Sequence, residues 1–387
     1  MHHDYTPDIR SLYRLPFSKN DNPNGWLEIT THCNMRCPNC YRGCDQESIP
    51  QFHESLEEVK TNIDELIRIR NCHIISISGG EPLLHPELPE IIRYISSKGA
   101  KPWLHTNGVL LAPDLIRQLG QCGLKGIIVR VDSLKNRSHR AAEKELNRER
   151  EKFAFMVARE KKIHLSFICV VNKENIGEIP DIVSWARDFS KYVDFIAFIP
   201  MRQVRFKEDD VIDTSRWIYL EDLCRVNAMR FAGLKYASFL GSQLEDSAIK
   251  WLQSVWVIDR GKMLGYASPR MVELFQVMHH FLQGKYAYKF GNGRSKIAYL
   301  SILLFSIFFK DMRPVGRACL KAILRNPLKL FGIASIQVMC YIIPPGLVNG
   351  RRDTCDGCPD AILYKGNLYP SCGLEEAKLE MVAEEMA

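Results

Sequence analysis

The stretch Trp26-Leu27-Glu28-Ile29-Thr30-Thr31-His32-Cys33-Asn34-Met35-Arg36-Cys37-Pro38-Asn39-Cys40 decides the fold, because a strand-like apolar run leads directly into three closely spaced cysteines. The spacing is C-x3-C-x2-C. Cubane iron–sulfur clusters are normally held by four thiolates. Three thiolates in one short loop therefore indicate a cluster with one iron left open for a non-protein ligand. A zinc site, with His32 or Cys44 as its fourth ligand, and a strained disulfide loop are the alternatives.

A second motif follows one strand and one helix later. Ile74–Ser78 is a short, β-branched apolar run, which predicts a buried parallel strand. It ends in Gly79-Gly80-Glu81-Pro82. Paired glycines at the end of a strand let a ligand approach the backbone closely. The position of this turn, behind the cysteine loop, indicates a shared binding site.

Strand-like and helical patterns alternate through the first half of the chain. Such alternation favours an α/β fold with a parallel sheet. The remaining strand predictions cover residues 102–105, 126–131, 165–171 and 195–199. The helix predictions cover Leu56–Arg70, behind a Ser55/Glu58 capping box, and residues 88–98, 114–121, 138–161 and 176–189.

The two motifs together resemble the radical S-adenosylmethionine (SAM) superfamily, over residues 23–205. The resemblance implies a partial (β/α)6 TIM-like barrel with its ligands at the carboxyl ends of the strands. It implies that Cys33, Cys37 and Cys40 hold a [4Fe–4S] cluster whose fourth iron is chelated by SAM. It also implies a flavodoxin- or ferredoxin-type reductant, and an oxidoreductase or transferase whose 5′-deoxyadenosyl radical takes hydrogen from an unactivated C–H bond.

The same resemblance implies a set of SAM contacts. Gly79, Gly80, Glu81 and Pro82 are expected to bind the amino group of SAM. The family usually has an aromatic residue before the third cysteine; here that residue is Asn39, so Tyr41 or the backbone is expected to face the adenine. Strand-to-helix turns prefer the same residue types for structural reasons. Candidates for the ribose and sulfonium are Thr106, Asn107, Asp132, Ser133 and Asn172.

A second cysteine group lies near the C-terminus, with the spacing C-x2-C-x13-C: Cys355, Cys358 and Cys372. It resembles the twitch and SPASM auxiliary-cluster domains, and its spacing is similar to that of the molybdenum-cofactor GTP cyclases, whose activity is not carried over. The resemblance implies a second [4Fe–4S] cluster. Its fourth ligand would be Cys340, Cys319, Cys224 or the substrate; a zinc hairpin or free thiols are the alternative. We expect the other cysteines to be small buried hydrophobes: Cys44, Cys72, Cys122 and Cys169.

The composition of the chain indicates how large its core can be and in which compartment it folds. A chain of 387 residues, 46% hydrophobic, can bury one large core and a smaller appendage. Thirteen cysteines, several in metal-ligand spacing, favour a reducing compartment, and the start lacks a signal-peptide pattern, so we expect a cytoplasmic protein. The expected division is an N-terminal extension (1–22), the barrel (23–205), a helical basic and apolar region (206–345) and an auxiliary-cluster domain (346–387).

The helical region contains the main substrate clue. Residues 274–352 hold 12 Lys and Arg against one acid, a net charge of +11 that leaves −4 for the rest of a chain carrying +7. The apolar run 297–309 is shorter than the roughly 20 residues that span a bilayer. Basic residues follow it at intervals of four, and Pro327 is expected to divide this part into two helices: Arg313, Arg317, Lys321, Arg325 and Lys329.

This pattern predicts either an interfacial segment at an anionic membrane, on its inner face, or an apolar pocket that holds lipid phosphates. An ordinary helical subdomain is the alternative. Nucleic acid is not expected, because aromatic residues are not interleaved with the charges. The sequence thus predicts a radical SAM enzyme acting on a lipid or other apolar substrate. A ribosomal-peptide maturase and a non-catalytic metal-binding interaction protein are the alternatives; about 25 residues before the first strand are too few for a winged-helix peptide-binding module.

Overall fold

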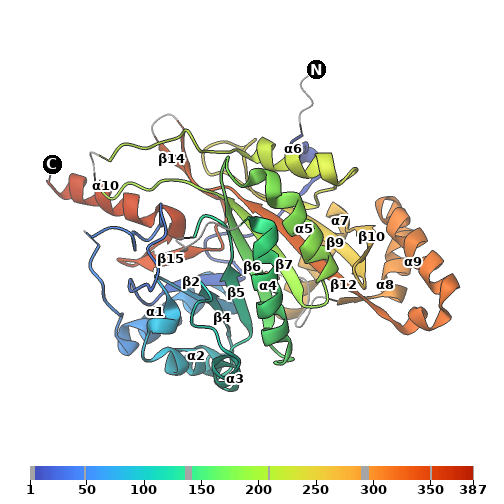
Figure 1. Cartoon of the computed structure of the whole chain (residues 1–387), viewed down its shortest axis with the longest axis horizontal. Helices are drawn as coiled ribbons and strands as arrows, with labels where there is room; N and C mark the ends of the chain where they lie inside the picture. Colours follow the sequence, from blue (N-terminus) through green and yellow to red (C-terminus); the bar gives the residue numbers. More distant parts are fainter. Residues whose placement is uncertain are drawn as a thin grey trace.

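The computed structural model describes residues 5–47, 49–135, 142–207, 210–288, 296–348 and 351–386. One long twisted sheet runs through the molecule, and α1 to α5 follow its first strands along one side (Figure 1). The sheet does not close on itself: its end strands are β1 and β16. This open α/β sheet confirms the predicted partial barrel.

Six parallel strands, each hydrogen-bonded to the next in sequence, form the first half of the sheet. Both faces of these strands are covered, which explains their nearly continuous apolar sequences. The strand predicted at Ile74–Ser78 lies at those residues, and the other boundaries differ by one or two residues. The six strands are β2 (Asn24–Glu28), β3 (Ile74–Ser78), β4 (Lys101–Thr106), β5 (Gly126–Arg130), β6 (His164–Val171) and β7 (Val193–Pro200).

The helices between these strands begin where the sequence has start signals. Ser55 caps the first helix by accepting a hydrogen bond from the Glu58 amide, and the Glu58 carboxylate accepts one from the Ser55 amide, as predicted. Residues 138–141 of the fourth predicted helix lie outside the described residues. The helices are α1 (Leu56–Arg70), α2 (Leu88–Ser97), α3 (Pro113–Gln121), α4 (Glu143–Ala158) and, after the 3-10 turn η3 (Ile176–Glu178), α5 (Ile179–Asp188).

The region expected to be helical, 206–345, is mixed. It holds α6 (Leu220–Arg230), α7 (Pro269–Gln283), α8 (Tyr299–Phe308) and α9 (Arg313–Arg325), but also five strands. Strand β12 (Ile333–Ile342) pairs parallel with β7 and antiparallel with β9 (Ile249–Asp259). Strands β9 and β12 are long, and side chains on both of their faces are buried. An amphipathic helix at this place could bury only one of its faces. Completing this part are β8 (Ser238–Gly241), β10 (Lys262–Tyr266), β11 (Lys296–Ala298) and, from the N-terminus, β1 (Tyr13–Arg14).

Successive residues of β7 belong to two different cores. Ile196 and Phe198 pack with the outer helices, whereas Phe195 and Ala197 pack with α7, α8 and α9. Side chains alternate between the two faces of a strand, so one strand can serve both cores. The second half of the chain therefore covers the inner face that an isolated barrel segment would leave open.

The C-terminal segment returns to the opposite edge of the sheet. The hairpin of β15 (Ala361–Tyr364) and β16 (Asn367–Pro370) adds to β2, with Ile362 in parallel register with Trp26. A separate two-stranded sheet, β13 (Gly346–Val348) and β14 (Arg351–Asp353), precedes it, and α10 (Leu374–Met386) follows it. The C-terminal cysteines therefore lie beside the strand that leads into the N-terminal ones.

Candidate functional site

The motif residues predicted from sequence gather at one edge of the sheet. The N-terminal cysteine loop, residues 31–44, follows β2; the Gly-Gly-Glu-Pro turn follows β3; and the candidate SAM contacts follow β4, β5 and β6. Parallel strands end at the same edge, so these turns are neighbours. The fold thus brings together residues more than a hundred positions apart in the chain.

The N-terminal cysteine loop is held by polar contacts around its thiols. Cys37 is buried, and Cys33 and Cys40 are partly exposed. The Met35 amide donates to Cys33 Sγ at 3.4 Å. Hydrogen bonding from the Cys44 thiol, together with the amides of Cys44 and Arg42, lowers the pKa of Cys40 to about 6. A thiol with a lowered pKa is more readily the thiolate that binds metal.

Cys44 is a residue of this loop whose surroundings differ from expectation. It is buried, as predicted, but its thiol donates to the carbonyl oxygen of Thr31 at 3.7 Å, and the thiols of Cys33 and Cys40 are near enough to shift its pKa. This proximity lowers the pKa of Cys33 and raises that of Cys44. The signal in the sequence was a fourth cysteine four residues beyond Cys40.

Among the residues that the structure describes, no three His, Cys, Asp or Glu side chains surround a single metal-ion position. A cubane cluster does not require such an arrangement, because its thiolates bind different irons. The donor set of the cysteine loop, three or four thiols and no carboxylate, fits an iron–sulfur cluster.

The Gly-Gly-Glu-Pro turn lies directly against the chain that enters the cysteine loop. A Cβ on Gly80 would lie 2.2 Å from the carbonyl oxygen of His32, and one on Gly79 would lie 2.3 Å from that of Thr30. Gly79 also has a positive φ of 138°. The amides of Gly80 and Glu81 donate to the carbonyls of Thr30 and His32, each at 2.7 Å. Only glycine permits this approach, and it fixes the turn relative to the cysteines.

The Glu81 side chain is fully buried and organises the neighbouring strand end. Its carboxylate accepts hydrogen bonds from Thr106 Oγ1 at 2.7 Å, from the Asn107 amide at 2.8 Å and from the Leu83 amide at 3.1 Å. Burial raises the Glu81 pKa, and these hydrogen bonds oppose the shift. With the carboxylate engaged by protein donors, the backbone carbonyls of the turn are the groups left for a ligand ammonium.

Asn107 links the end of β4 to the cysteine loop. Its Nδ2 donates to Asn34 Oδ1 at 2.7 Å and lies 3.9 Å from Cys33 Sγ. Lys135, a residue that the sequence did not single out, is buried and donates to the carbonyls of Asn107 and Arg130 at 2.6 and 2.9 Å. The two strand ends are therefore tied together beside Cys33.

The candidates after β5 are engaged mainly with protein groups. Asp132 is fully buried and accepts from Arg130 Nε at 2.8 Å and from the Val170 amide at 3.2 Å. Burial lowers the Arg130 pKa, but Asp132 and the thiols of Cys37 and Cys40 raise it above its ordinary value. Arg130 is thus a cation beside the cysteine loop that the sequence analysis missed.

Asn172, after β6, has an unusual free group. Its Oδ1 accepts from the Glu174 amide at 2.8 Å, but its buried Nδ2 has no hydrogen-bond partner in the described structure. Buried donors without partners are rare in native proteins. Ser133, by contrast, is bonded to Glu143 and Asn175. Of the ribose and sulfonium candidates, Asn172 has the clearest unused donor.

Tyr41, within the N-terminal cysteine loop, takes part in a buried polar cluster. Its hydroxyl donates to Glu28 Oε1 at 3.2 Å, and Arg42 Nε lies 2.6 Å from Glu28 Oε2. Arg42 also pairs with Glu375, in the first turn of α10. This polar cluster connects the loop to the C-terminal helix. It also gives the Tyr41 hydroxyl a hydrogen-bond partner without any ligand.

The C-terminal cysteine group lies at the other end of β2. Asn22 and Asn24 donate to the carbonyls of Gly357 and Pro359, at 3.2 and 3.1 Å, and Arg70 donates to that of Cys358 at 2.8 Å. The two ends of β2 are about 13 Å apart at 3.3 Å per residue.

The thiols of this second group are close to one another. The neighbouring Cys358 thiol raises the pKa of Cys355, and Cys358 also raises the pKa of Cys372, after burial. Of the proposed fourth ligands, Cys340 is the one linked to this group, through its interaction with the Asp360 carboxylate, which raises the pKa of both Cys340 and Cys372. The structure therefore brings Cys355, Cys358 and Cys372 together, with Cys340 as a neighbour.

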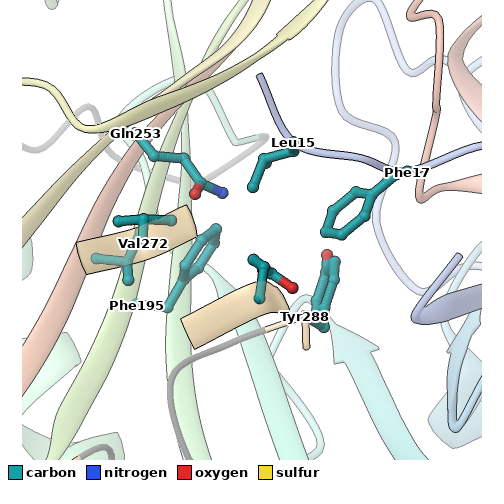
Figure 2. Close-up of a pocket in the computed structure, with 8 residues that line it drawn as sticks. Leu15, Phe17, Phe195, Gln253, Val272 and Tyr288 are labelled. Atoms are coloured by element: carbon teal, nitrogen blue, oxygen red, sulfur yellow. The ribbon is translucent and has the colours of Figure 1, made fainter. Parts of the chain in front are cut away.

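A small pocket adjoins this second group on the inner face of the sheet. Phe195 of β7, Gln253 of β9 and Val272 of α7 line it, and Phe17 and Tyr288 approach from the opposite side (Figure 2). Tyr288 lies close enough to Asp360 and Cys358 for their charges to raise its pKa, after the effect of burial. The pocket is too small for a substrate-sized ligand.

The hairpin of α8 and α9, with the following turn η5 (Pro327–Phe331), forms one end of the molecule, distant from α1 to α3 (Figure 1). We call residues 299–331 the basic apolar hairpin. The helices pack tightly, since a Cβ on Gly316 would lie 2.2 Å from Ser306 Oγ. Five of its large apolar side chains are between 67% and 88% exposed: Ile307, Phe308, Leu324, Leu328 and Phe331.

Lys329 of the same hairpin pairs with Asp259, and its exposed cations are Lys310, Arg313, Arg317, Lys321 and Arg325. The predicted division at Pro327 is confirmed, because α9 ends at Arg325. No helix within the described ranges is long and apolar enough to cross a membrane.

Comparison with known proteins finds a family match for part of the first half of the chain. Residues 27–186 match the model of the radical SAM superfamily. The chain is 37% identical to the AdoMet-dependent heme synthase of Methanosarcina barkeri over 112 residues, which cover 29% of this chain and 32% of that protein. It is 29% identical to the Fe-coproporphyrin III synthase of the same organism, over 46% of this chain and 45% of that protein.

A probable GTP 3′,8-cyclase of Methanococcus maripaludis is 32% identical over 48% of this chain and 63% of that protein. The chain thus spans less than two thirds of each of these relatives. Among solved structures, SuiB of Streptococcus suis bound to S-adenosylmethionine aligns with a TM-score of 0.41 and 15% identity, over 57% of this chain and 51% of that one.

Proposed function

We propose that this chain, in which residues 27–186 form a radical SAM domain, cleaves SAM reductively and uses the 5′-deoxyadenosyl radical to modify a C–H bond of a membrane lipid or other apolar substrate. Radical SAM domains use a [4Fe–4S] cluster and SAM, and the cofactor supplies the difficult chemistry. The observation that carries the proposal is the close approach of Gly79 and Gly80 to the chain entering a loop of four thiols.

In this proposal the protein binds and orients. Cys33, Cys37 and Cys40 hold the cluster, and the carbonyls of the turn at Gly79 and Gly80 receive the amino group of SAM. Glu81 keeps that turn and the end of β4 in place, through the hydrogen bonds to Thr106 and Asn107. An outside reductant of flavodoxin or ferredoxin type would donate the electron.

Asn172 Nδ2 and Arg130 would supply polar contacts to the ribose and carboxylate of SAM. Tyr41, Asp132 and Ser133 would then support the site from beneath rather than touch SAM, since protein groups already engage their polar atoms. The second group, Cys355, Cys358 and Cys372, is proposed to hold an auxiliary [4Fe–4S] cluster.

The substrate class rests on the basic apolar hairpin. Each large apolar side chain that enters a bilayer contributes about 1.5–3 kcal/mol, and each nearby cation contributes roughly 1 kcal/mol at an anionic surface. The five strongly exposed apolar residues and five exposed cations of the hairpin together favour reversible binding at the inner face of a membrane. An enzyme held there would meet lipids directly.

A tetrapyrrole is the second candidate substrate. The identities to the AdoMet-dependent heme synthase and the Fe-coproporphyrin III synthase favour it. A peptide substrate is a further outcome that the same assay detects.

The chemical test is an anaerobic incubation of the reconstituted protein with dithionite and SAM. Separate arms contain a total lipid extract, Fe-coproporphyrin III, or a peptide library, and mass spectrometry follows 5′-deoxyadenosine and any mass-shifted product. We expect a mass-shifted lipid in the first arm. SAM cleavage that persists when Cys33, Cys37 and Cys40 are all alanine would refute the cluster assignment, and a product in another arm alone would refute the lipid assignment.

The membrane test is co-sedimentation with vesicles of phosphatidylglycerol and phosphatidylcholine. We expect binding that weakens with salt, with neutral vesicles, and with R317Q, K321Q and R325Q combined. The matched control neutralises three exposed arginines on α1, α2 and α3, far from the hairpin, and should bind as the wild type does: Arg68, Arg93 and Arg117. Equal loss in both variants, or no binding at low salt, would contradict the membrane proposal.

A further inference from the structure

The exit of the N-terminal cysteine loop is held by segments from the second half of the chain. Its entry is fixed by the Gly-Gly-Glu-Pro turn, as described above. At its exit, Asn39 Nδ2 donates to Met201 Sδ at 3.5 Å, and a Cβ on Gly43 would lie 2.7 Å from the ring of Phe206. The segment that follows β7 therefore crosses the loop at both of these places.

A buried triad of ion pairs forms around Arg42, close to the exit. Arg42 Nε lies 2.6 Å from Glu28 Oε2 of β2, and the guanidinium also pairs with Glu375 of α10. The side chains of Arg42, Glu28 and Glu375 are only 8%, 2% and 10% exposed, so salt and water screen these pairs little. Arg42 is two residues beyond Cys40. Displacing Arg42 therefore displaces a proposed ligand of the cluster.

Two adjacent acids in the first turn of α10 hold two different segments near the cysteine loop. Glu375 pairs with Arg42, whereas Glu376 Oε1 accepts a hydrogen bond from the Arg205 amide at 3.2 Å, in the segment that crosses the loop. Glu376 Oε2 lies 3.2 Å from Nε of Arg352, which belongs to β14. The first turn of α10 thus joins the cysteine loop, the crossing segment and the C-terminal sheet.

Helix α10 begins directly after the second cysteine group. Cys372 lies in a 3-10 turn, and α10 starts two residues later. This turn is fixed on both sides: the amide before Cys372 donates to the Asp360 carbonyl at 2.9 Å, and the carbonyl after Cys372 accepts from Arg352 at 2.6 Å. Glu375 follows Cys372 by three residues. A cluster held by Cys372 would therefore help to set where Glu375 lies.

We propose that Glu375 is a positioning residue for the SAM-binding cluster: α10, anchored at Cys372, holds the exit of the N-terminal cysteine loop through the pair with Arg42. This inference rests on the proposed function, because it assumes clusters at both cysteine groups. Glu375 acts through Arg42 and touches neither SAM nor a cluster. Loading of the second group then favours SAM binding at the first, and by linkage SAM binding favours loading of the second group.

The substitution E375A removes this link and leaves the buried charges balanced. Glu28 and Arg42 remain as a one-to-one ion pair, and Lys378, the other partner of Glu375, is 31% exposed. The variant should therefore fold and retain both cysteine groups. E375D keeps the charge on a shorter side chain and should restore part of the function.

The experiment compares reconstituted wild-type protein with E375A, E375D and the control E90A, which removes an acid from an exposed ion pair on α2. Calorimetry measures SAM affinity, and iron analysis measures cluster content. The EPR signal of the reduced cluster with SAM reports the geometry of the first site. The variant C372A is measured in both the wild-type and the E375A background. Circular dichroism shows whether each variant folds.

We expect E375A to keep about eight irons per chain but to bind SAM at least about fivefold more weakly, at the lower end of typical coupling between sites. Its EPR signal with SAM should differ from that of the wild type. E375D should bind SAM with intermediate affinity, and E90A should match the wild type. C372A should weaken SAM binding in the wild-type background and add little in E375A, because the link is then already broken.

Wild-type SAM affinity and EPR signal in a folded E375A would overturn the inference, because Glu375 would then have a structural role alone. If E375A does not fold, E375Q takes its place, and unchanged SAM affinity in that variant overturns the inference. Equal weakening by C372A in both backgrounds would overturn the anchoring of α10 at Cys372. If the wild type itself binds neither a cluster nor SAM, the proposed function fails, which is a different result.

Discussion

The substitution G80A tests the contact between the Gly-Gly-Glu-Pro turn and the cysteine loop. A Cβ at this position would lie 2.2 Å from the His32 carbonyl oxygen and 2.8 Å from that of Thr31. Both are backbone atoms, so no side chain can rotate away. The turn must move, and it then loses the hydrogen bonds from the Gly80 and Glu81 amides, each 2.7 Å long.

The expected cost follows from these contacts. Two lost backbone hydrogen bonds cost about 1 kcal/mol each, and overpacking adds about 1–3 kcal/mol, so the free energy of unfolding falls by about 3–5 kcal/mol if none of the strain relaxes. SAM affinity should fall by about tenfold or more. A displaced turn that weakens the binding free energy of SAM by about 1.4 kcal/mol already corresponds to a factor of ten.

The assays are urea unfolding of the metal-free protein, followed by circular dichroism, and calorimetric SAM binding to the reconstituted protein. The matched control is G177A, because a Cβ at Gly177 meets nothing within 4 Å. The control should change the free energy of unfolding by less than about 0.5 kcal/mol. Unchanged stability and SAM affinity in G80A would refute the argument that the turn is fixed against the loop.

Three further predictions follow from buried groups. R42M leaves Glu28 and Glu375 without their buried cation and should lower the free energy of unfolding by about 3 kcal/mol or more, whereas R93M, which breaks an exposed pair, should have no measurable effect in the same urea titration. Burial, with Lys101 and other nearby cations, lowers the pKa of His73 to about 3. As pH falls, the unfolded chain therefore binds the proton before the folded protein does. Stability is lost as pH falls below about 6.5, by roughly 1 kcal/mol between about pH 7.5 and 5.5. The stability of H73Q should depend less steeply on pH over that range, and an equally steep dependence would contradict this assignment. Replacing the three C-terminal cysteines with alanine should reduce the iron content from about eight to about four per chain while SAM still binds; an unchanged iron content, or one zinc per wild-type chain, would favour the structural alternative.

The sequence by itself determined the local elements and the residues proposed for the first site. β-branched apolar runs such as Ile74–Ser78 predict strands, and the Ser55/Glu58 box predicts the start of α1, because these preferences depend on neighbours along the chain. The cysteine spacing and the Gly-Gly-Glu-Pro turn were equally local. Residues 27–186, the part that matches the radical SAM superfamily, are where prediction from sequence succeeded best.

Only the tertiary structure decided how the rest of the chain completes the sheet. Nothing local in residues 333–342 shows that they pair between β7 and β9, or that β15 joins β2, since strand pairing depends on which distant edges remain free. The same holds for Cys44. Its sequence neighbours are ordinary, and its hydrogen bond to the carbonyl oxygen of Thr31 arises from the folding of the loop after the end of β2.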